Sequence, residues 1–267
     1  MRIRIENEMP IYGLNAVRAL AEVHPEEINR FFLRKEHMTE FGNLCKSLAE
    51  RRHPYKICED EELERLAKSP RHQGLVAMIA PRSVAPLTVE ELKKIVAEGK
   101  DFLVLDSVGN DHNLGAIARS AVFFNIPNII VNSGDEQARL ASSAHRVAEG
   151  GLERVPVYSV GNLGNFLNDI QKDVLVIGAD HRARNRLDEL DELRKQAVKK
   201  LFGAASSRFG LGANIPCAIV LGNEERGLSD SAKKACAILL RIAGTGLMES
   251  LNVAQAANLF MYELYKG

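Results

Sequence analysis

The sequence predicts an α/β protein with a small α/β domain over residues 1–80, a linker over residues 81–98 and a larger parallel-sheet domain over residues 99–267. The stretch PRSVAPLTVE at residues 81–90 contains prolines and few large apolar side chains, which is typical of a linker. Short all-apolar strands that alternate with helices indicate a parallel sheet covered on both faces. Runs of this kind occur at residues 102–105, 129–131, 174–177, 218–221 and 238–242.

The first eighty or so residues, about the size of a small domain, alternate helical and extended patterns after a short polar lead. A helix-like run begins near Ile11 and ends at Pro25, because proline cannot continue a helix. Beyond Pro25 we expect, in order, a strand at 31–33, a charged helix at 41–52, a strand at 55–58, a small helix at 59–67, a turn at 72–74 and a strand at 75–80.

Composition restricts the classes of partner. Lys plus Arg equals Asp plus Glu, at 35 each, so the chain has no bulk attraction for polyanions and RNA binding requires a local patch. The four cysteines show no CxxC spacing, so we expect no metal site and no disulfide framework. No apolar run is long enough for a membrane span, which favours a cytoplasmic protein without a membrane partner. Candidates for a basic patch are Arg139, Arg146, Arg154, Arg182, Arg184 and Arg186.

The stretch RIAGTGLMESLNVAQAANLFMYEL at residues 241–264 is a candidate ligand site. A strand end leads through Gly244 and Gly246 into a helix that begins at Ser250 to Asn252. Glycines let backbone amides approach a ligand, and a helix N-terminus presents unpaired N–H groups. An ordinary strand-to-helix turn with a polar cap explains the same pattern equally well.

Two further loops follow predicted strands. In the first, Asn113 is expected to cap an apolar helix in which Arg119 is the single charge; that arginine either extends to the surface, forms a structural pair or belongs to a site. In the second, Gly222 and Gly227 flank Glu224. The second loop does not match a P-loop. Neither Gly210 with Gly212 nor Gly244 with Gly246 gives a dinucleotide-binding fingerprint, which disfavours NAD and FAD.

Other polar residues have plain structural interpretations. We expect His112, His145 and His181 to be loop or surface residues rather than catalytic bases. The charged segment at residues 188–200 is expected to be an exposed helix face.

Together the loops resemble the signature motifs of the SpoU or TrmH class of RNA ribose 2'-O-methyltransferases, in the SPOUT superfamily. The three motifs read NDHNLGAIARSA, IVLGNEERGLSD and RIAGTGLMESLNVAQAA, and upstream YGLNAV and HQGLVA resemble the bounds of the ribosomal-protein-like RNA-binding domain of many members. The resemblance implies a deep trefoil knot in the parallel-sheet domain, a homodimer packed through the knotted region, and S-adenosylmethionine bound among the loops after Ile177, Leu221 and Ile242.

The resemblance also implies which residues act. The expected reaction is methylation of a ribose 2'-hydroxyl in structured RNA, rRNA rather than tRNA. Arg119 is expected to orient a phosphate or stabilise a developing alkoxide, because a guanidinium is a poor base. The motif positions expected to be catalytic are Asn113, Arg119, Glu224, Ser250 and Asn252. Those expected to bind the cofactor are Gly178, Ala179, Leu221, Gly222, Gly227, Ile242, Gly246 and Leu251.

The chain departs from the family pattern at two places. Asn110 and Asp111 stand where Asp-Pro or Asn-Pro is usual, and Ala243 follows Ile242 where Ile-Pro is usual. Asp111 could pair with Arg119 or repel RNA phosphate. An alternative prediction is therefore an RNA-binding protein on the same fold that has lost catalysis. A second alternative is an α/β enzyme that acts on a small anionic substrate.

Overall fold

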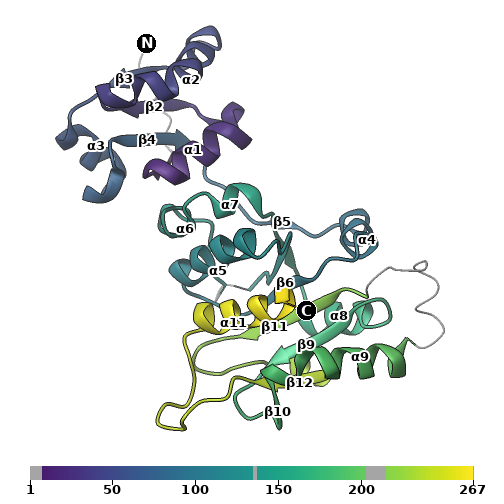
Figure 1. Ribbon diagram of the computed structural model, residues 1–267. Helices are drawn as coiled ribbons and strands as arrows, with labels where there is room; N and C mark the ends of the chain where they lie inside the picture. The colour runs from purple at the N-terminus through teal and green to yellow at the C-terminus, as the bar shows by residue number, and fades with distance from the viewer. Residues whose placement is uncertain (1–7, 135–136, 203–214, 267) are drawn as a thin grey trace.

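A computed structural model describes residues 8–134, 137–202 and 215–266. It shows two bodies, each with its own sheet, and the C-terminal helix returns to the middle of the larger one (Figure 1). In the described part of the chain, no helix has the length and apolar character that crossing a membrane requires.

The first body is a four-stranded mixed sheet with strand order β1-β4-β2-β3. Strand β4 is central and wholly buried, and it pairs antiparallel with both β1 and β2. The elements are β1 (Met9–Tyr12), α1 (Leu14–Val23), η1 (Pro25–Glu27), β2 (Arg30–Leu33), η2 (Lys35–His37), α2 (Met38–Glu50), β3 (Tyr55–Ile57), α3 (Asp60–Ala67), η3 (Pro70–His72) and β4 (Leu75–Ile79).

Two apolar clusters cover the faces of this sheet. Residues of α1 and α2 pack with Phe31 and Leu33 on one face, whereas α3 packs with Val76 and Met78 on the other. The expected helices and strands are present, but β1 (Met9–Tyr12) is a strand where the end of a polar lead and the start of a helix-like run were expected. The four residues of β1 alternate in burial only weakly, so their pairing with β4 decides their conformation.

The second body is an eight-stranded sheet with strand order β10-β12-β9-β11-β6-β7-β8-β5, in which every pairing is parallel. This confirms the predicted parallel sheet, including all the apolar runs proposed as strands. Its strands are β5 (Ala85–Pro86), β6 (Phe102–Asp106), β7 (Ile129–Asn132), β8 (Val157–Val160), β9 (Leu175–Ala179), β10 (Asn185–Arg186), β11 (Cys217–Gly222) and β12 (Ile238–Arg241).

Helices cover both faces of this sheet, as expected for a parallel sheet. One cluster joins α5, α6, α9 and α11 to alternate strand residues such as Leu103 and Leu105, and the other joins α4, α8 and α10 to Phe102 and Val104. The helices are α4 (Val89–Ala97), α5 (Asp111–Phe123), α6 (Ser142–Ala148), α7 (Gly151–Arg154), α8 (Leu163–Ile170), η4 (Leu187–Glu189), α9 (Leu190–Leu201), α10 (Asp230–Ala235) and α11 (Val253–Lys266).

The segment expected as a linker is largely folded into the second body. Strand β5 pairs with β8, and α4 buries Ile95 against the sheet. A capping box explains the start of α4: the Thr88 hydroxyl accepts from the Glu91 N–H, and the Glu91 carboxylate accepts from the Thr88 N–H. The expectation of a linker over residues 81–98 is therefore wrong for the stretch from β5 through α4.

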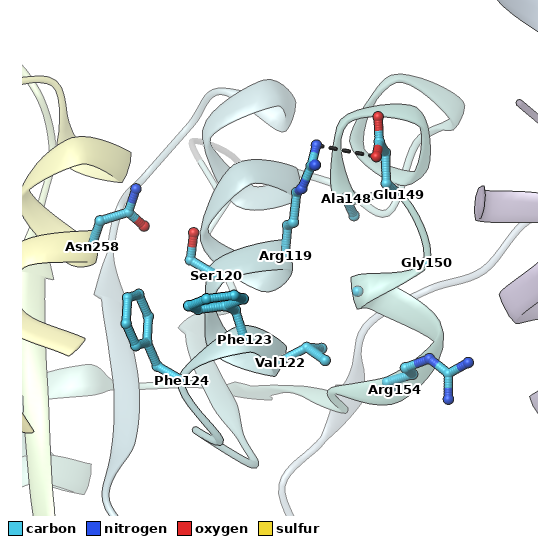
Figure 2. A pocket seen from close by; sticks show the side chains of 11 residues that line it. Arg119, Ser120, Val122, Phe123, Phe124, Ala148, Glu149, Gly150, Arg154 and Asn258 are labelled. Atoms are coloured by element: carbon cyan, nitrogen blue, oxygen red, sulfur yellow. Dashed lines mark ion pairs between the residues drawn. The ribbon is translucent and has the colours of Figure 1, made fainter. Parts of the chain in front are cut away.

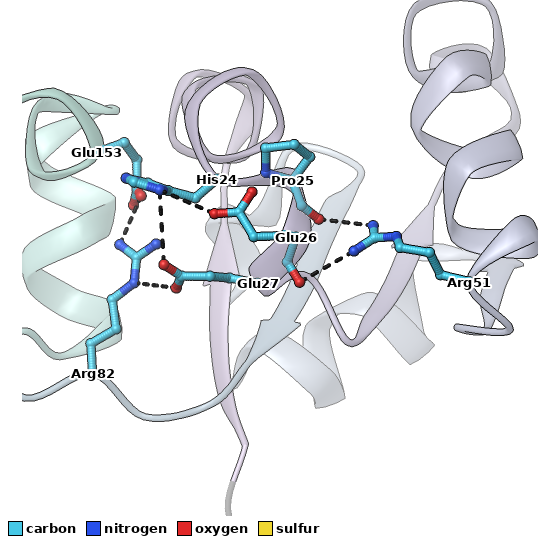
Figure 3. A network of polar contacts seen from close by, with 7 residues as sticks. All are labelled: His24, Pro25, Glu26, Glu27, Arg51, Arg82 and Glu153. Atoms are coloured by element: carbon cyan, nitrogen blue, oxygen red, sulfur yellow. Dashed lines mark hydrogen bonds and ion pairs between the residues drawn. The ribbon is translucent and has the colours of Figure 1, made fainter.

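A buried ionic cluster joins the two bodies. Arg82 lies between Glu27 of the first body and Glu153 of α7 (Figure 3), at 2.8 Å and 2.7 Å. Glu153 also lies 2.9 Å from Nδ1 of His145, and both side chains are almost fully buried. His145 is thus a core residue of α6, not the loop or surface residue that was expected, because it has an acidic partner inside the protein.

Candidate active site

The three motif loops meet at one edge of the second sheet. Strands β12, β9, β11 and β6 are parallel neighbours in that order, so their carboxyl ends face the same way. The loops that follow them, at residues 180–184, 222–228, 242–252 and 107–110, therefore lie together. Crevices at the carboxyl ends of parallel strands are the usual ligand sites of α/β proteins.

A chain of hydrogen bonds joins the three motifs. The Asn113 amide donates from Nδ2 to the Glu224 carboxylate, and Asn252 Nδ2 donates to Asn113 Oδ1 at 3.0 Å. Asn113 is only 9% exposed. Because both ends of its amide are engaged, the orientation of Asn113 is fixed between the second and third motifs.

Helix α5 presents Asn113 differently from what was expected. The helix begins at Asp111, and its cap is Asn110, whose Oδ1 accepts from the His112 N–H at 2.8 Å. Asn113 is therefore not the cap, because Asn110 already satisfies the helix start. This leaves the Asn113 side chain available for Glu224 and Asn252.

The loop after β11 is a tight turn built by its own backbone and by Asn223. Asn223 and Gly227 exchange two backbone hydrogen bonds, and Asn223 Oδ1 accepts from the N–H groups of Glu225 and Arg226. A Cβ at Gly222 would overlap the backbone of Gly227, and Gly227 itself has φ +69°. The two glycines thus permit a close turn that holds Glu224 towards Asn113.

Two site-shaping residues were not predicted from the sequence. Buried Asp106, the last residue of β6, accepts from the Ser229 N–H at 2.7 Å, and Asn223 Nδ2 donates to the Ser107 carbonyl at 2.9 Å. Both bonds tie the first loop to the second. The sequence does contain a feature that could have identified Asp106: it is a carboxylate at the end of an otherwise apolar strand, and a buried carboxylate needs polar partners.

The third loop places Asn252 at the start of α11. Asn252 Oδ1 accepts from the Ala254 N–H at 2.9 Å, so the same side chain caps the helix and reaches Asn113. Ser250 and Leu251 are exposed in the loop. Of the motif-three pair expected to act together, Asn252 belongs to the hydrogen-bonded chain and Ser250 lies beside it along the sequence.

The residues expected to bind the cofactor lie at the strand ends around this edge. Gly178 and Ala179 are in β9, Leu221 and Gly222 end β11, and Ile242 follows β12. Gly244 and Gly246 have no atom within 4 Å of where a Cβ would stand, and Gly246 has φ +83°. Open glycine backbone beside an exposed Leu251 suits a ligand with an apolar ring and polar edges, so the residues present fit a nucleoside such as that of S-adenosylmethionine.

Asp180, in the loop after β9, is an ionised anchor. Burial alone would raise the pKa of Asp180, but the Arg182 N–H and the Lys233 ammonium outweigh it and hold that pKa below its usual range. Lys233 Nζ lies 3.0 Å from Oδ2. The pair fastens this loop to α10.

Arg119 lies apart from the hydrogen-bonded chain. It follows Asn113 by six residues on α5, which is about 9 Å along the helix axis. Its side chain is 59% exposed, and its Nη1 lies 3.2 Å from Glu149 Oε2. Figure 2 shows the guanidinium turned towards Glu149 and paired with it. Both residues line a cavity of about 400 Å³, together with Phe123, Phe124 and Asn258.

Asp111 does not contact Arg119. Its Oδ1 accepts from the Arg139 N–H at 2.8 Å, and Oδ2 accepts from the Ser143 hydroxyl at 3.3 Å. The carboxylate fastens the segment before α6 to the start of α5. The predicted loss of catalysis through an Asp111–Arg119 pair therefore has no support in this geometry.

The fold and the site define an α/β enzyme with its ligand site at the carboxyl edge of a parallel sheet, preceded by a separate mixed-sheet domain. The chain belongs to the SpoU rRNA Methylase family, whose model matches residues 100–262. A second model, described as RNA 2'-O ribose methyltransferase substrate binding, matches residues 10–85. The chain is thus an RNA ribose 2'-O-methyltransferase that uses S-adenosylmethionine.

Known proteins resemble the chain over nearly its whole length. It is 30% identical over 259 residues to the 23S rRNA (guanosine-2'-O-)-methyltransferase RlmB of Nitrosomonas europaea, covering 96% of this chain and 90% of the relative. It is 32% identical over 260 residues to RlmB of Acinetobacter baylyi, covering 94% of each.

Solved structures share the fold at lower identity. The AdoMet-bound rRNA methyltransferase from Sinorhizobium meliloti matches with a TM-score of 0.70 at 18% identity, over 98% of this chain and 88% of that one. The SpoU methyltransferase AviRb from Streptomyces viridochromogenes, in complex with AdoMet, matches with a TM-score of 0.64 at 19% identity, over 98% and 90%.

Proposed function

We propose that this enzyme methylates the ribose 2'-hydroxyl of a guanosine in 23S rRNA. Two relatives with that printed activity match it at 30% and 32% identity over almost the full length of both chains. The observation that carries the proposal is the hydrogen-bonded chain Glu224–Asn113–Asn252, which unites the three motifs at one sheet edge. We infer that the molecule works in the cytoplasm, where bacterial rRNA is made.

Each motif residue has a role in this proposal. Bound S-adenosylmethionine supplies an electrophilic methyl group. The fixed amide of Asn113 and the carboxylate of Glu224 orient the ribose hydroxyl, because in-line attack requires close alignment of the reacting atoms. Asn252 holds Asn113, and Ser250 presents its hydroxyl beside them. Arg119 binds the neighbouring phosphate and stabilises negative charge that develops on the ribose oxygen.

The cofactor pocket in this proposal is formed by the loops after β9, β11 and β12. The open backbone of Gly246 approaches the polar edges of the nucleoside, and Leu251 covers an apolar face. The other contacts are proposed for Gly178, Ala179, Leu221, Gly222, Gly227 and Ile242. We also propose that residues 1–80 bind the RNA substrate and residues 99–267 carry out the transfer.

The position of Arg119 supports a homodimer in which the arginine serves the partner's site. Arg119 is displaced along α5 from Asn113 and projects from another side of the helix, which favours placing it at the partner's site rather than beside Asn113 of its own chain. Large aromatic side chains are exposed near it: Phe123, which lines the same cavity, is 79% exposed, and the exposed Tyr262 and Tyr265 of α11 contact the neighbouring Phe124. Large exposed aromatics of this kind mark protein interfaces.

We infer that the trefoil knot is part of the same architecture. Strand β12 pairs with β9 on one side and with β10 on the other. Strand β12 thus lies between two strands that precede it in the chain, and this arrangement supports the inference.

The substrate proposal is tested by methyl transfer to separated RNAs. We expect label from S-adenosylmethionine to enter 23S rRNA taken from a strain that lacks this modification, and to stay out of 16S rRNA and tRNA from the same strain. Transfer to tRNA alone would contradict the assignment of rRNA as the substrate. The assignment of the protein as an RNA methyltransferase would still hold.

The dimer proposal is tested by mixing two inactive variants, Asn113→Ala and Arg119→Ala. If Arg119 acts on the partner's site, each mixed dimer has one site with both residues intact, so co-refolded protein should regain about a quarter of wild-type activity by random pairing. Activity that stays at the level of the separate variants would place both residues in one chain's site. Light scattering on the wild type gives the oligomeric state independently.

A further inference from the structure

Glu149 occupies an unusual backbone position between α6 and α7. It has φ 46° and ψ 45°, the left-handed region that favours glycine. Gly150 follows, and a Cβ there would meet Ala19 of α1. A glutamate side chain is thus retained, against a backbone cost, at the turn where the second body touches the first.

The Glu149 carboxylate contacts three side chains from three elements. Oε2 accepts from Asn15 Nδ2 at 3.1 Å and lies 3.2 Å from Arg119 Nη1, while Oε1 lies 3.4 Å from Arg146 Nη1. Asn15 belongs to α1 of the substrate-binding body, and Arg119 belongs to motif one. Glu149 is therefore the link between the two.

This link extends further into the first body. Arg18 donates from Nη1 to Asn15 Oδ1 at 3.2 Å and from Nε to Glu40 at 2.6 Å. The Asn15 amide is held at both ends, so its direction towards Glu149 depends on α1 and α2. Among the described residues that line the Arg119 cavity, Glu149 is the only acid, which leaves it as the local counter-charge.

We propose that Glu149 is a positioning residue for Arg119, a proposal that rests on the role given to Arg119 above. Through its bond to Glu149, Asn15 makes the orientation of the Arg119 side chain depend on how the substrate-binding body docks. Arg119 is long and mostly exposed, so without a partner it would sample many rotamers. The exposed pair is weak in water, so RNA phosphate can take up the remaining donors of the guanidinium without first breaking a strong bond. Glu149 thus sets the direction of Arg119 before RNA arrives.

The test is steady-state methyl transfer by Glu149→Ala, Glu149→Gln and Asn15→Ala in the full-length enzyme. For Glu149→Ala we expect kcat to fall about tenfold, while KM for RNA and Kd for S-adenosylmethionine change less than about twofold, because the loss is one of alignment. Glu149→Gln retains an acceptor and should recover part of the rate. Asn15→Ala should change kcat in the same direction by a smaller factor.

Glu22→Ala is the matched control. Glu22 pairs with Arg154 across the same junction without contacting Arg119 in the described structure, so its removal should leave kcat unchanged. In an Arg119→Lys background, Glu149→Ala should cause little further loss, because the group that it positions is already altered. Thermal unfolding of each variant checks that the fold is retained.

The outcomes separate this inference from the proposed role of Arg119. If Arg119→Ala is inactive and Glu149→Ala has wild-type kcat, the positioning role of Glu149 is wrong and the role of Arg119 survives. A higher kcat in Glu149→Ala would also overturn the inference, because the glutamate would then restrain the arginine. Wild-type turnover by Arg119→Ala would refute the role of Arg119 itself.

Discussion

Asn113 is the central residue of the proposed site, because its buried amide bonds to Glu224 at one end and to Asn252 at the other. An alanine there leaves both partners without the group that orients them. We expect Asn113→Ala to lower kcat about a hundredfold, with S-adenosylmethionine affinity nearly unchanged, since misplaced reactive groups cost rate more than binding. Single-turnover transfer and calorimetric titration of the cofactor measure the two effects.

Asn113→Asp is the companion variant. The aspartate has the size of asparagine and keeps the acceptor oxygen. It places a second carboxylate oxygen against Glu224 where the Asn113 Nδ2 donor stood, and two like charges repel each other. It should be as inactive as the alanine variant. Substantial activity in Asn113→Asp would show that the Asn113–Glu224 bond is not required.

At individual positions, the sequence predicted that Asn113, Glu224 and Asn252 lie together, but it did not predict how their side chains are held. Asn113, Glu224 and Asn252 lie far apart in the chain, and only the resemblance to family motifs grouped them. The predicted cap at Asn113 was wrong because two asparagines stand three residues apart, and single-residue capping preference does not distinguish them. The role of Asp111 required the position of Arg139, which no local pattern supplies.

At the scale of elements, the turn after β11 is the most constrained part of the site. A Cβ at Gly222 would overlap the backbone of Gly227 and Leu228, so the turn would have to open. We therefore expect Gly222→Ala to weaken S-adenosylmethionine binding at least about tenfold, because a small backbone shift misaligns several contacts together. Isothermal titration measures this loss.

Gly42→Ala is the control for that experiment. Gly42 lies within α2, and no atom lies within 4 Å of where its Cβ would stand. Alanine should be neutral there or stabilise the protein by up to about 1 kcal/mol, since glycine disfavours helix. Equal cofactor affinity in Gly222→Ala and wild type would show that the turn is not part of the pocket.

Buried central strands were predictable as elements because a short, uninterrupted apolar run between turn residues is typical of a strand covered on both faces. The elements at the edges of the sheet, or next to an edge, were not predictable in this way. Strands β5 and β10 are two residues long, and β8 has a single fully buried residue, so pairing with neighbours defines them. Helix α4 was overlooked because flanking prolines suggested a linker, although Thr88 and Glu91 form a capping box.

At the scale of the whole molecule, Glu153 holds the two bodies together through Arg82. Burial alone would raise the pKa of Glu153, but its close contact with the His145 ring and the charge of Arg82 outweigh burial and lower that pKa. A carboxyl whose pKa is lower in the folded state stabilises the protein above the unfolded value of about 4.3 and loses this contribution as pH falls through the folded value.

We expect Glu153→Gln to lower the free energy of unfolding by about 3 kcal/mol at pH 7, because it removes the buried charge partner of Arg82 and leaves only the more exposed Glu27. The difference from wild type should shrink as the pH falls below about 4.3. Urea unfolding of both proteins at pH 7 and near pH 3.5 measures it. A difference that is independent of pH would contradict the ionic explanation.

The division into two bodies followed from composition and patterning, but their contact did not. Arg82, Glu27 and Glu153 are distant in sequence, and their charges looked like ordinary surface charges until the fold brought them together. The same is true of Asn15, Glu149 and Arg119. Long-range side-chain pairing depends on tertiary position, which local periodicity does not encode.

The chemical identity of the methylated product tests most directly whether this enzyme methylates the ribose of a guanosine. 23S rRNA methylated by the wild-type enzyme with labelled S-adenosylmethionine is digested to nucleosides and separated by mass. We expect the label in 2'-O-methylguanosine and expect it to be lost with Asn113→Ala. Label in a base-methylated nucleoside, or unchanged labelling with Asn113→Ala, would contradict this expectation.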